Sequence, residues 1–84
     1  MPTEAEVADK LTASLNPSHL EVSDSSDGCG AKFNVIVVTT QFEGKPLLDR
    51  HRMVNDALSE EMKTIHALTM KTYTPEQWLK ISQK

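Results

Sequence analysis

The segment from Phe33 to Thr40 places the strongest constraint on the fold, because all but one of its residues are β-branched or aromatic. Such residues favour strands, and a segment that is apolar on both faces fits best in the middle of a sheet. Upstream, the segment from His19 to Val22 alternates polar and apolar side chains, as a half-exposed strand does. We therefore expect the two segments to pair as a hairpin, with the later one central.

A first helix is predicted over about residues 3–15. Thr3 and Glu6 have the spacing of a capping box, in which each residue satisfies a backbone N–H of the other. Apolar residues then recur at helical intervals. The pair Asn16-Pro17 is expected to end the helix.

The second half of the chain predicts two further helices separated by a strand. The segment 42–46 reads as a turn, and from Pro46 an apolar stripe follows helical spacing: Leu47, Leu48, His51, Val54, Leu58 and Met62. We expect this helix to break near Ser59 into a shorter one through Met62. Residues 65–72 are strand-like. A capping box from Thr74 to Gln77 then opens a last helix, which is expected to bring Trp78, Leu79 and Ile81 to the core.

The predicted order is therefore helix, strand, strand, helix, short helix, strand, helix. Each helix has one apolar face to bury, so we expect an α+β fold with helices packed on one face of a small, three-stranded mixed sheet. With 84 residues the chain is predicted to form one domain, residues 1–84. A domain of this size has room for one core and no deep pocket, which argues against an enzyme.

Charge and composition narrow the class of partner and the compartment. The formal net charge is −3, which disfavours a strong sequence-independent grip on nucleic-acid phosphates. A single cysteine excludes an internal disulfide and indicates a reducing compartment, the cytoplasm or the nucleus. No apolar stretch has the length of a membrane span, and the first six residues are acidic where a targeting peptide would be basic. We therefore expect no membrane association.

Cys29 lies between Gly28 and Gly30, directly after a polar run of serines and aspartates. Glycine on both sides removes steric hindrance around the thiol, whereas a cysteine that packs in a core normally lies in an apolar run. The pattern favours an exposed loop thiol that forms half of a site. Such a thiol would also be open to oxidation or glutathionylation, which would block its use as a ligand.

The three histidines differ in their surroundings. His51 lies on the apolar stripe between Arg50 and Arg52, which favours a structural role, and His19 reads as a surface residue at the start of a strand. His66 begins the last predicted strand, and its spacing alone leaves both a structural role and a ligand role open. Tyr73 and Trp78 are interpreted as packing residues.

Taken together, these motifs resemble the BolA family over nearly the whole chain: Phe42-Glu43-Gly44-Lys45, Leu48, Arg50-His51-Arg52, Val54, Glu60 or Glu61, His66-Ala67-Leu68, and Pro75 with Trp78. The Gly-Cys-Gly loop and the lack of a presequence resemble the cytosolic and nuclear branch of eukaryotic BolA-like proteins. The resemblance implies a fold like the type II KH domain and a monothiol glutaredoxin as partner. It also implies a bridging 2Fe-2S cluster, held here by His66 and Cys29 and completed by the glutaredoxin's cysteine and a glutathione thiolate.

Counting ligands agrees with a shared cluster. A 2Fe-2S cluster takes four ligands, and one cysteine with three histidines cannot supply four thiolates. We therefore expect a monomer that binds no cluster tightly alone. The family resemblance implies that it acts as an adaptor in iron-sulfur cluster trafficking and iron homeostasis. Arg50 and Arg52 are predicted to contact the partner, because guanidinium groups offset the charge of its thiolates.

Two other functional classes, nucleic-acid binding and catalysis, match parts of the sequence. A KH-like domain suggests nucleic-acid binding or transcriptional regulation, and the chain has a few lysines and arginines near the second predicted helix. However, glycines at 28, 30 and 44 do not give the Gly-x-x-Gly loop with which KH domains clamp nucleotides. Cys29 and His66 resemble a nucleophile and base, but no third residue is evident to orient the histidine.

Overall fold

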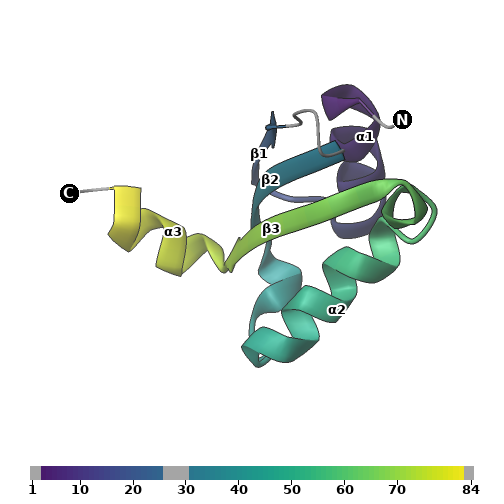
Figure 1. The fold of residues 1–84 in the computed structure, drawn as a ribbon. Coiled ribbons are helices and arrows are strands. Elements are labelled where there is room, and N and C mark those ends of the chain that lie inside the picture. The colour runs from purple at the N-terminus through teal and green to yellow at the C-terminus, as the bar shows by residue number, and fades with distance from the viewer. Residues whose placement is uncertain (1–2, 26–30, 83–84) are drawn as a thin grey trace.

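A computed structural model describes residues 3–25 and 31–82, so Cys29 lies outside the described residues. Its elements confirm the predicted order along the chain (Figure 1): α1 (Glu4–Leu15), β1 (His19–Asp24), β2 (Ala31–Val38), η1 (Thr40–Phe42), α2 (Leu47–Ala57), η2 (Glu61–Lys63), β3 (Ile65–Tyr73) and α3 (Pro75–Ser82). The class is α+β, as expected. None of the described helices has both the length and the apolar character that a membrane crossing requires.

The sheet is three-stranded and mixed, in the order β1-β2-β3. Strand β1 pairs with β2 in antiparallel fashion, whereas β2 and β3 run parallel. The apolar segment that was predicted to be central is therefore the central strand. Its parallel pairing with β3 requires a crossover, which α2 and η2 provide.

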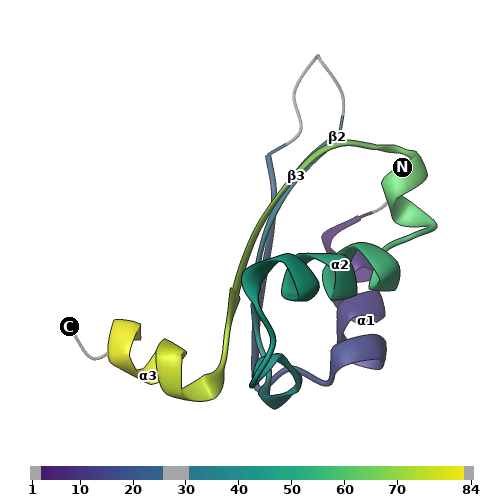
Figure 2. The same ribbon diagram turned by 90° about the horizontal axis from the view of Figure 1, so that it is seen from below.

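Helices α1 and α2 cover one face of the sheet, as Figure 2 shows. The core lies between them and the sheet, and it consists of ten buried side chains: Val7, Leu11, Leu15, Phe33, Val35, Val37, Phe42, Val54, Leu58 and Ile65. Each such side chain contributes about 1.5–3 kcal/mol when fully buried. The other face of β2 carries Asn34, which is exposed, and Ile36, which is half-buried.

The helix ends follow the local signals in the sequence. The Thr3 hydroxyl accepts a hydrogen bond from the Glu6 backbone N–H at 3.1 Å, and Asn16 ends α1 in the left-handed conformation. At α3 the capping box is reciprocal: the Thr74 hydroxyl accepts from the Gln77 N–H at 3.2 Å, and the Gln77 side-chain oxygen accepts from the Thr74 N–H at 3.0 Å. These caps confirm both predicted helix starts.

The turn before α2 also has a local cause. The Lys45 N–H donates to the Phe42 carbonyl at 3.0 Å, with Glu43 at φ −64° and ψ 131° and Gly44 at φ 76°. These angles are those of a type II turn, whose third residue needs a positive φ that glycine adopts without strain. The predicted turn is thus a defined one, and it places Pro46 at the N-cap of α2.

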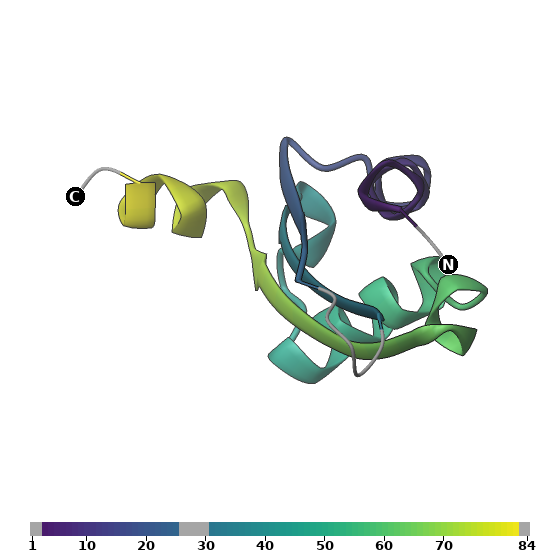
Figure 3. The same cartoon turned by 45° about the horizontal axis from the view of Figure 1, so that its top comes forward.

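The last helix differs from the prediction. Helix α3 extends away from the two layers beyond the end of β3 (Figure 3), and none of its residues is buried. Leu79 is 55% exposed and Ile81 40% exposed, so neither joins the core. Trp78 is half-buried and stacks on the ring of His19, with centroids 4.6 Å apart. A half-exposed histidine ring thus covers the face of the tryptophan.

The first turn of α2 is a second departure. Leu47 and Leu48 continue the apolar stripe in sequence, but they are 60% and 61% exposed. Val54 and Leu58, further along the same stripe, are fully buried. Periodicity identified the inward face of the helix correctly. It did not reveal that the helix begins beyond the area that the sheet and α1 cover.

Candidate metal centre

His66 is the second residue of β3, at a register shift in the sheet. Ala31 of β2 pairs with Ile65, but the next residue, Lys32, pairs with Ala67. Strand β3 therefore carries one extra residue, His66, which has no partner in the register. A β-bulge of this kind redirects a side chain and is common beside functional sites.

The bulge changes which side chains face the core. In a regular strand, side chains three positions apart point to opposite faces. Here Ile65 is 7% exposed and Leu68 also packs against the core, while His66 and Ala67 between them are both exposed. Neither ring nitrogen of His66 has a hydrogen-bond partner among the described residues. The imidazole of His66 is thus exposed, while Ile65 before it and Leu68 after it pack against the core.

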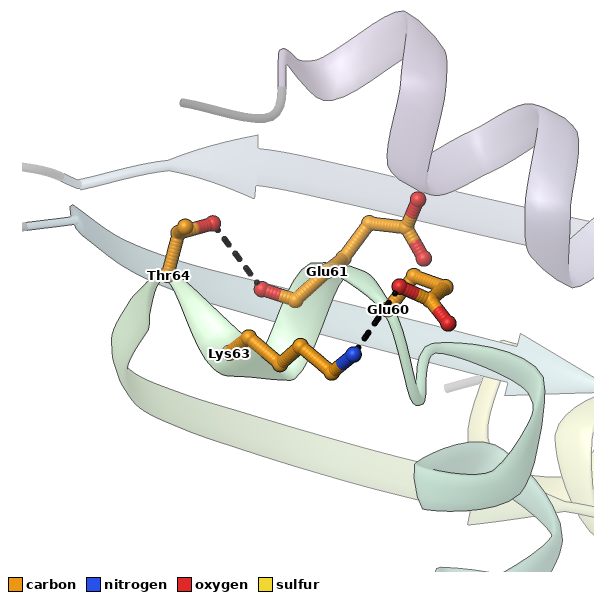
Figure 4. Close-up of polar contacts among 4 residues, drawn as sticks. All are labelled: Glu60, Glu61, Lys63 and Thr64. Carbon is orange, nitrogen blue, oxygen red and sulfur yellow. Dashed lines mark hydrogen bonds and ion pairs between the residues drawn. The ribbon is translucent and has the colours of Figure 1, made fainter.

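The connection that leads into β3 is closed by short-range bonds (Figure 4). The Thr64 hydroxyl donates to the Glu61 carbonyl at 3.1 Å, and the Met62 N–H donates to the Leu58 carbonyl at 2.8 Å. The Lys63 ammonium also lies 3.2 Å from the Glu60 carboxylate. This ion pair is exposed, so it contributes little to the stability of the fold. These contacts fix the chain immediately before Ile65, and therefore the point from which His66 projects.

The end of β1 and the start of β2 lie at the same end of the sheet as the start of β3. Strand β1 ends at Asp24 and β2 begins at Ala31, beside the start of β3. The Ser25 N–H donates to the Lys32 carbonyl at 2.8 Å, which holds the two strands together there. The segment that contains Cys29 therefore connects two strands at the end of the sheet where His66 lies. The pairing of these two residues stays a prediction, since Cys29 lies outside the described residues.

The other histidines lie elsewhere. His19 pairs with Val38, which in turn pairs with Tyr73 at the far end of β3, seven residues or about 23 Å from His66. Its ring nitrogen lies 2.7 Å from the Glu21 carboxylate. His51 is half-buried on α2. Within residues 3–25 and 31–82, no three histidine, cysteine or acidic side chains gather as a metal site.

Arg50 also belongs to the far end of the sheet. Its Nε donates to the Lys45 carbonyl at 2.9 Å, and its Nη1 donates to the Gln77 side-chain oxygen at 2.9 Å. Nη1 also lies 3.4 Å from the Thr72 carbonyl. Arg50 therefore ties the start of α2 to the end of β3 and to α3, a structural role that no sequence motif indicated. The structure does not bring it to His66.

Arg52 lies on α2 with an exposed side chain. No hydrogen bond or ion pair joins its guanidinium group to another described residue. It is free to meet a partner, and its predicted contact, like that of Arg50, stays a prediction.

The comparison with known families identifies the fold. The family model described as "BolA-like protein" matches residues 11–77, which include α2, β3 and His66. The chain belongs to the BolA family. The resemblance noted in the sequence is thereby confirmed.

Similar proteins cover nearly the whole BolA-like chain. "Protein BOLA2" of Arabidopsis thaliana is 60% identical over 84 residues, which span 99% of this chain and 90% of that protein. "BolA-like protein 2" of Homo sapiens is 49% identical over 77 residues, 90% of each. The crystal structure of a BolA-like protein from Babesia bovis is 48% identical, with a TM-score of 0.92 over 100% of this chain and 96% of that one.

Proposed function

We propose that this BolA-like protein is a non-enzymatic adaptor that pairs with a monothiol glutaredoxin and shares a bridging 2Fe-2S cluster with it. The observation that supports the proposal is the position of His66: an exposed imidazole at a β-bulge, without a protein partner among the described residues. His66 lies at the end of the sheet where β1 ends and β2 begins, on either side of the segment that contains Cys29. The role we assign is iron-sulfur cluster trafficking and iron homeostasis, in the cytoplasm and nucleus.

The residues of this chain fit half of such a site. His66 would supply a nitrogen ligand and Cys29 a thiolate, and the glutaredoxin's cysteine with a glutathione thiolate would complete the four. A cluster with histidine on one iron has a higher reduction potential than an all-cysteine one. Imidazole ligation also makes the bond sensitive to protonation, which suits a site that releases its cluster.

Reconstitution with a purified monothiol glutaredoxin, glutathione, iron and sulfide tests the proposal. The mixture should contain a heterodimer whose visible absorption and circular dichroism differ from those of the glutaredoxin alone. His66→Ala should abolish that spectrum or shift it to that of a glutaredoxin homodimer. His51→Ala, at the histidine on α2, is the matched control and should retain it. Retention of the heterodimer spectrum by His66→Ala would refute the assignment.

Cys29→Ser refines the ligand assignment in the same assay. His66 is held by its strand, so little of its bond energy is spent on ordering, whereas a loop residue costs about 1–2 kcal/mol to fix. We therefore expect Cys29→Ser to retain a cluster-bound heterodimer that loses its cluster faster and has altered absorption. Native mass spectrometry under anaerobic conditions follows both species. Greater damage from Cys29→Ser than from His66→Ala would overturn this ranking of the two ligands.

A further inference from the structure

A groove of about 580 Å³ lies at the far end of β3, between the first turn of α2 and helix α3. Its apolar lining includes Leu47 and Ile81, which are 60% and 40% exposed, together with the half-buried ring of Tyr73. Large exposed apolar side chains on one concave surface of a small protein mark a binding site more often than isolated ones do. These are the residues that the sequence assigned to the core and the fold left outside it.

The polar lining of the groove is positively charged. Lys45, Arg50 and Lys80 contribute to it, and no acidic side chain does. Arg50 donates its hydrogen bonds to neutral oxygens, the carbonyls of Lys45 and Thr72 and the side-chain amide of Gln77, so its charge is not neutralised there. Lys80 lies 3.5 Å from the Glu76 carboxylate, one helical turn away, in an exposed pair of little strength. A chain of net charge −3 thus concentrates three of its nine basic side chains around one groove.

Thr72 also lines the groove. It is 5% exposed, and its hydroxyl oxygen is buried without a hydrogen-bond partner. The accessible surface of the groove therefore combines apolar side chains with positive charge from three segments of the chain.

We propose that this groove docks a short acidic segment of a partner protein, with apolar side chains in the groove and carboxylates toward Lys45, Arg50 and Lys80. A segment fits better than a small carboxylate, because the three cations come from separate elements and a single carboxylate would meet only part of them. Thr72 lies six residues, or about 20 Å, along β3 from His66. Where the proposed function holds, the segment and the partner at His66 bind at opposite ends of the sheet, and Arg50 meets the segment instead of the glutaredoxin.

The probe is a short helical peptide with leucine on one face and glutamate on the other, labelled for fluorescence anisotropy. It should bind the full chain saturably, and binding should weaken as salt is raised. The same peptide with lysine in place of glutamate should not bind. No saturable binding of the acidic peptide, or equal binding of the basic one, would overturn the proposal.

Two matched pairs of variants locate the site. Lys80→Glu should weaken peptide binding about tenfold, whereas Lys63→Glu should change it less than about twofold. The two lysines are alike: both are paired within one turn, with 76% and 72% of the side chain exposed. Leu47→Ser should weaken binding about fivefold. Leu48→Ser, at an equally exposed neighbour that does not line the groove, should leave binding unchanged. Equal effects within either pair would place the peptide outside the groove.

Two further measurements separate this site from the alternatives. His66→Ala should leave peptide binding unchanged, and a loss of binding in that variant would show that the peptide binds at the other end. A medium-chain fatty acid, added at the same concentration as the peptide, should not displace the peptide. Displacement that is lost in Lys80→Glu would identify the groove as a small-molecule site and overturn the proposal of a protein segment.

Discussion

The two ends of β3 present opposite kinds of surface. At its start, Ile65 is buried and the exposed residue beside it, His66, is a potential metal ligand on a bulged strand. At its end, Tyr73 leads into a helix with no buried residue, and the exposed side chains around it are apolar and cationic. One end carries an exposed imidazole on a bulged strand. The other carries exposed apolar side chains and positive charge.

This contrast follows from the size of the domain. A chain of 84 residues has one core, and here helices α1 and α2 cover one face of the sheet to form it. The ends of the strands lie at the margins of that cover. Polar and charged side chains can lie there without interrupting the core.

Ile65 and Ile81 give the largest expected difference between the two ends. Ile65→Ala should lower the free energy of unfolding by about 2–5 kcal/mol, because it leaves a cavity in the core. Ile81→Ala, at a residue that is 40% exposed, should lower it by less than about 0.5 kcal/mol. Urea unfolding followed by circular dichroism measures both. Similar losses would mean that α3 belongs to the cooperative core, contrary to the contrast drawn above.

Thr74→Ala tests whether α3 is held mainly by its cap. The change removes the hydroxyl that accepts from the Gln77 N–H, and an N-cap loss of this kind costs about 1 kcal/mol. Hydrogen exchange should quicken in α3 and remain unchanged in α1, whose cap is Thr3. Thr3→Ala is the matched control and should show the reverse pattern. Faster exchange throughout the sheet in Thr74→Ala would show that the far end stabilises the whole domain.

Arg52→Glu has the smallest expected effect. Its exposed guanidinium should favour an anionic partner, so the charge reversal should weaken the glutaredoxin complex by about 0.5 kcal/mol, more at low salt. Lys10→Glu, at another exposed cation but on α1, is the control and should have no effect. Isothermal titration at two salt concentrations measures both. A larger loss from Lys10→Glu would move the partner surface to the first helix.

Local signals predicted most of the elements. The caps at Thr3 and Thr74, the turn at Gly44 and the β-branched run of β2 act within a few residues, so their effect on the backbone can be inferred without the rest of the fold. The family motif also identified His66 as a candidate ligand. The structure places His66 beside the end of β1 and the start of β2, and its role as a ligand stays a prediction.

The surfaces depended on the tertiary structure. The bulge at His66 arises from the pairing of β2 with β3, and the residue types at positions 65–67 do not predict it. Leu47 and Ile81 are exposed because the sheet and α1 do not extend over them. The periodicity of apolar residues along one helix carries no information about where other elements end. Arg50 likewise acquires its role from Thr72 and Gln77, more than twenty residues away. The sequence by itself determined the elements and their inward faces, because those rest on short-range bonds and periodicity. Only the packing of distant segments decided which side chains were left outside the core, because exposure depends on what the rest of the chain covers.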